Sequence, residues 1–74
     1  MTQTTVETIA VAINGTPRQV PRDATLLEVL AALGLDPRLV VVEHNRRIVR
    51  RPALGDVRVA PGDALELVHF VGGG

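Results

Sequence analysis

The sequence predicts an α+β fold, a mixed sheet of four to five strands with one main helix packed on one face. Three observations support this prediction. Residues 8–13 alternate between large aliphatic and smaller side chains and end at an Asn-Gly pair. Residues 25–34 have apolar side chains at helical spacing between recognisable helix ends, and residues 64–71 alternate again. Alternation is typical of half-buried strands, and a 3.6-residue repeat is typical of an amphipathic helix.

The first two strands are expected to form a hairpin. Every second residue from Ile9 to Ile13 is a large aliphatic, which gives residues 8–13 one core-facing side. Asn14-Gly15 follows, and both residues tolerate the positive φ of a type I′ turn. A strand over residues 16–20 therefore returns antiparallel. Pro17 has no N–H to donate, so we expect this strand toward an edge of the sheet or Pro17 at the start of the strand.

The helix has readable ends. Thr25 and Glu28 fit a capping box, in which each side chain accepts a hydrogen bond from the other residue's backbone N–H. Gly34 is expected to take the left-handed conformation that ends a helix. Four apolar side chains between these ends form one stripe: Leu26, Val29, Leu30 and Leu33. A helix of about ten residues is marginal alone, so this one is expected to lie on the sheet.

The second half of the chain supplies the remaining strands. Residues 40–44 are a β-branched run that ends at Asn45-Arg46, and residues 47–49 continue beyond that turn. The following segment has no clear period and is expected to be a loop with at most one helical turn. Pro61-Gly62-Asp63 predicts a turn, and residues 64–71 the closing strand. We expect this strand to pair parallel with the first in the sheet centre, which is the β-grasp, or ubiquitin-like, architecture.

Composition excludes several classes of function. The 74 residues contain no cysteine, so a disulfide or a thiolate metal site is impossible, and we expect a cytoplasmic protein. Eight basic residues balance eight acidic ones, which argues against a nucleic-acid or membrane partner recognised through net charge. The N-terminal residues lack the features of a signal peptide. We expect a monomer that binds no cofactor or metal.

The sequence predicts three parts: a flexible leader over residues 1–7, a folded domain over residues 8–71 and a flexible tail over residues 72–74. The tail is Gly72-Gly73-Gly74. Glycine has no Cβ and contributes nothing to a core, so the tail is expected to be a thin arm that ends in the Gly74 carboxylate. Such an arm can enter a narrow site and react there. The alternative is an ordinary frayed terminus.

The closing strand presents different side chains on its two faces. Leu65 and Leu67 share one face, while Val68 and Phe70 share the other. If the leucines lie under the helix, then Val68 and Phe70 point outward next to the tail. An exposed aromatic beside a functional arm is a good interface anchor. The alternative is that Phe70, the single aromatic residue, closes one end of the core.

The remaining polar residues suggest no catalytic or metal site. We expect His44 and His69 to be solvated or hydrogen-bonded surface residues. Asp63 is expected to close its turn through the side chain, with a partner contact as the alternative. Four arginines form a basic cluster that is either a solvated edge or a docking site for an acidic partner: Arg46, Arg47, Arg50 and Arg51.

Several motifs resemble those of the ThiS/MoaD family of ubiquitin-like sulfur carriers, over nearly the whole chain from Ile9 onward. The most specific is the segment that runs from Pro61-Gly62-Asp63 through Leu65-Glu66-Leu67-Val68 to Val71-Gly72-Gly73-Gly74. The others are Val11-x-Ile13-Asn14-Gly15, Thr25-Leu26-Leu27-Glu28-Val29-Leu30 with Leu33-Gly34, and Val42-x-x-Asn45. Two positions depart from the family pattern. Arg46 stands where the family commonly has Gly, and Leu54 falls near a position often occupied by Trp.

The resemblance implies a two-step chemistry at Gly74. A ThiF-like adenylating enzyme would use ATP and magnesium to couple the Gly74 carboxylate to AMP. A sulfur-donor protein would then leave a thiocarboxylate, and a ThiG-like thiazole synthase would accept the sulfur during thiamine biosynthesis. Gly72 and Gly73 would thread the partner's active site, and Val68, Phe70 and Val71 would dock it. The chain would be a protein co-substrate with no catalytic residue of its own.

Two other functions remain open at this point. Within the same class, the chain resembles the small subunit of molybdopterin synthase and other thiocarboxylate carriers, which share the Gly-Gly ending. From a different class, a non-catalytic ubiquitin-like interaction module would carry an inert tail. A stand-alone enzyme has little support, because the sequence offers no nucleophile–base pair, phosphate loop or metal cluster.

Overall fold

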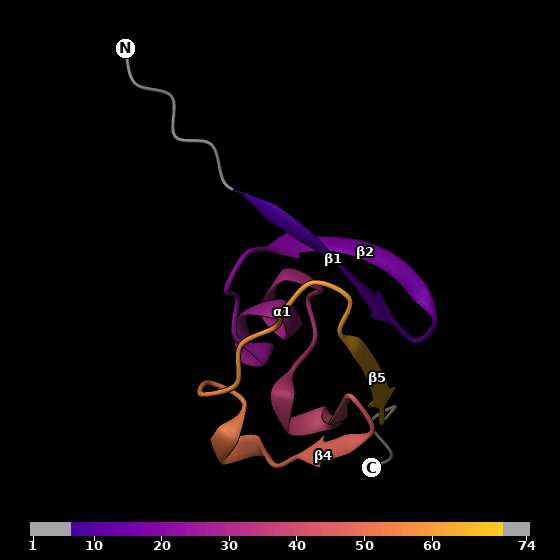
Figure 1. The fold of residues 1–74 in the computed structure, drawn as a ribbon. Coiled ribbons are helices and arrows are strands. Elements are labelled where there is room, and N and C mark those ends of the chain that lie inside the picture. The colour runs from indigo at the N-terminus through magenta and orange to yellow at the C-terminus, as the bar shows by residue number, and fades with distance from the viewer. Residues whose placement is uncertain (1–6, 71–74) are drawn as a thin grey trace.

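The computed structural model describes residues 7–70 and contains a five-stranded sheet with one α-helix against it (Figure 1). The strands lie in the order β2-β1-β5-β3-β4. In chain order the elements are β1 (Thr8–Ile13), β2 (Thr16–Pro21), α1 (Leu26–Ala32), β3 (Val40–His44), β4 (Arg47–Val49) and β5 (Ala64–His69), with short 3₁₀ turns at Pro37–Leu39 and Arg51–Ala53. This is the predicted β-grasp architecture.

The closing strand lies in the centre of the sheet. It pairs parallel with β1, where Ile13 is opposite Leu65. On its other side it pairs antiparallel with β3, where Val42 is opposite Leu67. The predicted parallel pairing of the first and last strands is therefore confirmed. The strand itself ends at His69, two residues before the predicted boundary, and Val71 lies outside the described residues.

Two tight turns connect the sequential antiparallel pairs. At the β1–β2 turn, Asn14 and Gly15 have φ of 50° and 81°, as the Asn-Gly pair predicts. The β3–β4 turn has the same character, with φ of 49° at Asn45 and 69° at Arg46. A positive φ is unfavourable for a residue with a long side chain, so the backbone of Arg46 is strained.

Helix α1 ends as its sequence predicts. Thr25 N–H donates to Glu28 Oε1 at 2.9 Å, and Glu28 N–H donates to Thr25 Oγ1 at 3.1 Å. Hydrogen bonding to the Glu28 carboxyl, first from the Thr25 backbone N–H and then from the Thr25 side chain, lowers the pKa of this carboxyl. At the other end, the N–H of Gly34 (φ 72°) donates to Ala31 and that of Leu35 to Leu30, which forms a Schellman motif.

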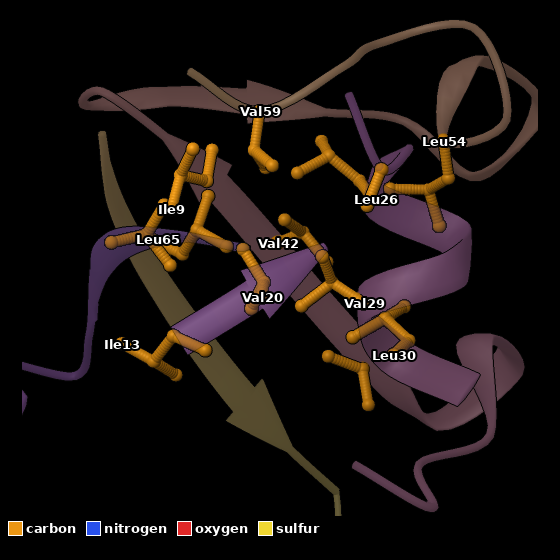
Figure 2. Close-up of a cluster of buried hydrophobic side chains, with 13 residues drawn as sticks. Ile9, Ile13, Val20, Leu26, Val29, Leu30, Val42, Leu54, Val59 and Leu65 are labelled. Carbon is orange, nitrogen blue, oxygen red and sulfur yellow. The ribbon is translucent and has the colours of Figure 1, made fainter. Parts of the chain in front are cut away.

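The core lies between the helix and one face of the sheet (Figure 2). Leu26, Val29 and Leu30 of the predicted stripe are each 1 % exposed. The chain between β4 and β5 also contributes side chains to the core. Its sequence has no hydrophobic periodicity, so this burial was not predicted. Leu54 is 1 % exposed, and Val59 is buried beside Ala24, whose carbonyl accepts its N–H at 2.9 Å.

Some predicted features fall partly outside the described residues. Of the predicted leader, only Glu7 is described, and its carbonyl accepts a hydrogen bond from the Arg22 N–H at 2.8 Å. The predicted tail over residues 72–74 lies outside the described residues. Within residues 7–70, no helix is long and apolar enough to span a bilayer.

The strain at Arg46 predicts that Arg46→Gly stabilises the protein. Glycine adopts φ near 69° without a Cβ clash, and the gain exceeds its extra unfolded-state entropy, so the free energy of unfolding should rise by about 0.5–1 kcal/mol. Urea denaturation measures this change. Gly15→Ala is the matched control, because Gly15 (φ 81°) occupies the same position of the other turn with open space around it. That substitution should destabilise the protein, and a loss of stability in Arg46→Gly would contradict the argument.

Candidate functional site at the end of the central strand

The last described residues of the chain carry the candidate site. Leu65 is buried under the helix and Leu67 is partly buried, while Val68 and Phe70 are each 54 % exposed. The predicted division of β5 into a core face and an exposed face is confirmed. The exposure of Phe70 also shows that this ring does not close the core. Val71, Gly72, Gly73 and Gly74, which sequence analysis assigned to docking and reaction, lie outside the described residues.

Val68 and Phe70 extend an apolar area onto the neighbouring strand. Val41 of β3 is directly opposite Val68 on the face of the sheet turned away from the helix. The N–H of Phe70 donates to the Leu39 carbonyl at 2.7 Å, so pairing with the β3 side continues one residue beyond β5. We call Val41, Val68 and Phe70 the outer patch. The hydrogen bonds hold it in place up to the residue that precedes Val71.

Asn14 fixes the half of β5 that leads to the outer patch. Backbone pairing with β1 includes Leu65 but does not reach Leu67. At Leu67 the side chain of Asn14 makes the hydrogen bonds that the β1 backbone does not. Its Oδ1 accepts the Leu67 N–H at 2.7 Å, and its Nδ2 donates to the Leu67 carbonyl at 3.2 Å. The amide thus replaces one peptide unit of β1. The Asn-Gly pair predicts only the turn role of Asn14, since a contact across 53 positions leaves no local signal in the sequence.

A second polar network holds the start of β5. Asp63 Oδ2 accepts the Ala60 N–H at 2.8 Å, which confirms that Asp63 closes its turn. The same oxygen lies 2.6 Å from His44 Nε2, and Asp63 Oδ1 accepts from Asn45 Nδ2 at 3.2 Å. His44 is therefore a hydrogen-bonded residue, as predicted, but its partner was not foreseen.

Burial and hydrogen bonding act in opposite directions on Asp63. Partial burial raises the pKa of its carboxyl, while the bonds from His44, Ala60 and Asn45 lower it, and the net effect is a lowered pKa. This carboxylate joins the β3–β4 turn to β5, so its role is to hold the strand in register. Within residues 7–70, no group of three or more His, Asp or Glu residues is placed to hold a metal.

Comparison with known proteins assigns the family. The model of the ThiS family matches residues 7–74, which is nearly the whole chain and includes the glycine tail. The chain belongs to the ThiS family. It is 38% identical to the sulfur carrier protein ThiS of Bacillus subtilis over 50 residues, covering 68% of this chain and 76% of that protein. A crystal structure of the thiamine biosynthesis protein ThiS from Geobacter metallireducens superimposes with a TM-score of 0.77 at 33% identity, covering 89% of this chain and all of that one.

Two longer relatives are thiazole synthases. Those of Magnetococcus marinus and Paramagnetospirillum magneticum are 40% and 44% identical to this chain over 62 residues. The match covers 84% of this chain but only 19% of each thiazole synthase. The chain thus spans about a fifth of the length of these relatives, so each of them contains a segment related to the ThiS family within a larger protein.

The lowered pKa of Asp63 predicts how stability depends on pH. A carboxyl whose pKa is lower in the folded state stabilises that state fully above its unfolded-state pKa, near 3.8, and this contribution is lost as the pH falls through the lowered value. Asp63→Asn should therefore flatten the dependence of the unfolding free energy on pH below about pH 4. Urea denaturation at a series of pH values measures the slope.

Other carboxyls leave a residual slope. Hydrogen bonds from Arg38 lower the pKa of Asp36 to about 2, so this residue continues to titrate in the variant. Asp56→Asn is the control, because this exposed side chain accepts no hydrogen bond in the described part of the chain. The control should keep the wild-type slope. Equal slopes in Asp63→Asn and the wild type would contradict the assignment.

Proposed function

We propose that this chain is the sulfur carrier of thiamine biosynthesis and that the Gly74 carboxylate is the group that carries the sulfur. The observation that carries the proposal is the ThiS-family match, which continues through the glycine tail to residue 74. The structure supports it, because Val68 and Phe70 of the outer patch are exposed at the end of β5 and directly after it, a few residues before this tail. The chain acts as a protein co-substrate, and the catalytic groups belong to its partners.

The chemistry follows from the low reactivity of a carboxylate. A ThiF-like partner adenylates Gly74 with ATP and magnesium, because attack of the carboxylate oxygen on the α-phosphate releases pyrophosphate and creates a good leaving group. Sulfide-level sulfur, HS⁻ delivered by a donor protein, attacks the carbonyl carbon and forms the C–S bond, while the C–O bond to AMP breaks and AMP leaves. The product is a Gly74 thiocarboxylate.

The residue types of the tail suit this chemistry. The acyl adenylate must be shielded from water, so the tail has to enter an enclosed site. Gly72 and Gly73 have no side chains to obstruct a narrow entrance. Four extended residues, 71–74, reach about 13 Å at roughly 3.3 Å each, which suffices to enter a buried site from a docked domain.

The thiazole synthases among the relatives support the identity of the sulfur acceptor. In these proteins a ThiS-like segment shares one polypeptide with the rest of a thiazole synthase. Joining two proteins in one chain raises their effective concentration, which is useful only if they meet. We therefore assign a ThiG-like thiazole synthase as the protein that accepts sulfur from this carrier.

The proposal predicts a defined covalent product. Incubation with the activating enzyme, ATP, magnesium and a sulfur donor should add the mass difference between sulfur and oxygen, and fragmentation should map it to Gly74. Intact-mass spectrometry measures both. Deletion of Gly73 and Gly74 should abolish the product while the unfolding free energy stays unchanged. An unmodified wild-type chain in the presence of a competent activating enzyme would refute the proposal.

The outer patch predicts that Phe70→Ala impairs docking without impairing folding. Removing an exposed anchor should raise the KM for the carrier about tenfold, equivalent to about 1.4 kcal/mol, and change stability by less than about 0.5 kcal/mol. The measurement is the rate of pyrophosphate release as a function of carrier concentration. Leu27→Ala is the control, because Leu27 is an exposed aliphatic residue on the helix. An equal increase in KM for the control would rule out a specific role of the outer patch.

A further inference from the structure

Half of the basic residues of the protein lie at one edge of the sheet. All eight basic residues are arginines, and four of them fall between positions 46 and 51. These four are exposed: Arg46, Arg47, Arg50 and Arg51. Among the residues that the structure describes, no carboxylate lies within ion-pair distance of any of them. We call this group the basic edge.

The basic edge adjoins the outer patch. The β3–β4 register pairs Val42 with Val49, so the next residue, Arg50, comes beside Val41 of the patch. Arg50 continues β4 with extended backbone at φ −72° and ψ 153°. Alternation along the chain therefore places Arg50 on the same face as Ile48 and the outer patch. Arg50 of the basic edge therefore adjoins the outer patch at Val41.

An open cleft of about 490 Å³ lies at this edge and combines the two kinds of surface. Its lining includes Val41 and Ile48 together with Arg50 and Arg51. Ile48 is 68 % exposed, more than any other large hydrophobic residue in the described part of the chain. A small anion would use the arginines and leave Ile48 in water. A protein surface with carboxylates around an apolar depression would use both.

The charge of the basic edge distinguishes two possible protein partners, a second copy of this chain and a different protein with an acidic surface. A second copy that docked symmetrically through β4 would bring two sets of arginines together, and this repulsion disfavours it. A different protein with carboxylates at these positions gains bidentate hydrogen bonds, for which the planar guanidinium is suited. Because β4 has only three residues, side chains rather than strand addition must supply the contact.

We propose that the basic edge and Ile48 form a docking site for an acidic surface of the enzyme that activates the tail. This inference rests on the proposed function, since it names the surface by which that enzyme is recognised. The edge orients the carrier during encounter, and the outer patch then packs beside the entrance through which the tail passes. Steering by such a local field raises association rates by roughly ten- to a thousandfold and weakens with salt.

The test compares two pairs of charge reversals. Arg50→Glu with Arg51→Glu reverses the edge, and Arg18→Glu with Arg22→Glu makes the same change in net charge with two exposed arginines on and beside β2, at the opposite edge of the sheet. Pyrophosphate release is measured against carrier concentration at low and at physiological salt. Reversal of the edge should raise KM at least about tenfold with kcat unchanged, and it should abolish the rise in KM that salt causes for the wild type. The β2 pair should keep the wild-type KM and salt dependence.

Binding measured apart from chemistry separates this inference from the proposed function. Calorimetry with the same enzyme and a carrier that lacks Gly73 and Gly74 reports docking alone, and urea denaturation verifies that each variant is folded. Modification of Gly74 with equal KM for the edge variant and the wild type would overturn the docking site and leave the function intact. A second outcome is that the wild type binds in a salt-dependent way, only the edge variant loses this binding, and Gly74 is not modified. That outcome would support the docking site and refute the proposed function. Equal effects of both charge pairs, or no binding to the enzyme, would overturn the docking site.

Discussion

The rest of the structure depends on the pairing of β5 on both of its sides. Parallel bonds to β1 and antiparallel bonds to β3 hold this strand in the sheet centre. A central strand has no free edge, so its backbone position is fixed by two neighbours rather than one. The chain segment that carries the candidate site is thereby among the most constrained parts of the molecule. The proposed reactive tail begins at Gly72, three positions after the end of this constrained strand.

The register of β5 decides which of its side chains are buried. A slip of one residue would exchange its two faces, exposing Leu65 and burying Val68 and Phe70. Apolar packing of Leu65 opposes such a slip, and polar side chains oppose it at both ends. Asn14 Oδ1 accepts the Leu67 N–H within the strand, and Asn45 Oδ1 accepts the Ala64 N–H at 2.9 Å at its start. The two asparagines come from the two tight turns, which explains why a turn residue with a polar side chain serves better here than a second glycine.

Local patterns predicted the fold well because the sequence signal of each element spans only a few residues. The Asn-Gly turn, the capping box and the alternation of β5 all act over short distances, and the structure confirms them. What the sequence could not show are contacts between distant positions. The second role of Asn14, the partnership of His44 with Asp63 and the burial of Leu54 depend on how the finished sheet brings separate segments together. Val68 and Phe70 were found because alternation and position beside the tail are both local signals.

Net charge was a poor guide to electrostatic recognition because it averages over local clusters of charge. Equal numbers of acidic and basic residues excluded partners attracted by overall charge, yet four arginines cluster between positions 46 and 51, at one edge of the sheet. The field of such a group is screened over about 8 Å at physiological ionic strength. Residues 71–74 would reach about 13 Å if fully extended. In the proposed encounter, orientation by charge and entry of the tail would therefore operate over similar distances. A neutral carrier with one charged edge gains orientation at close range without the non-specific attraction that a high net charge would bring.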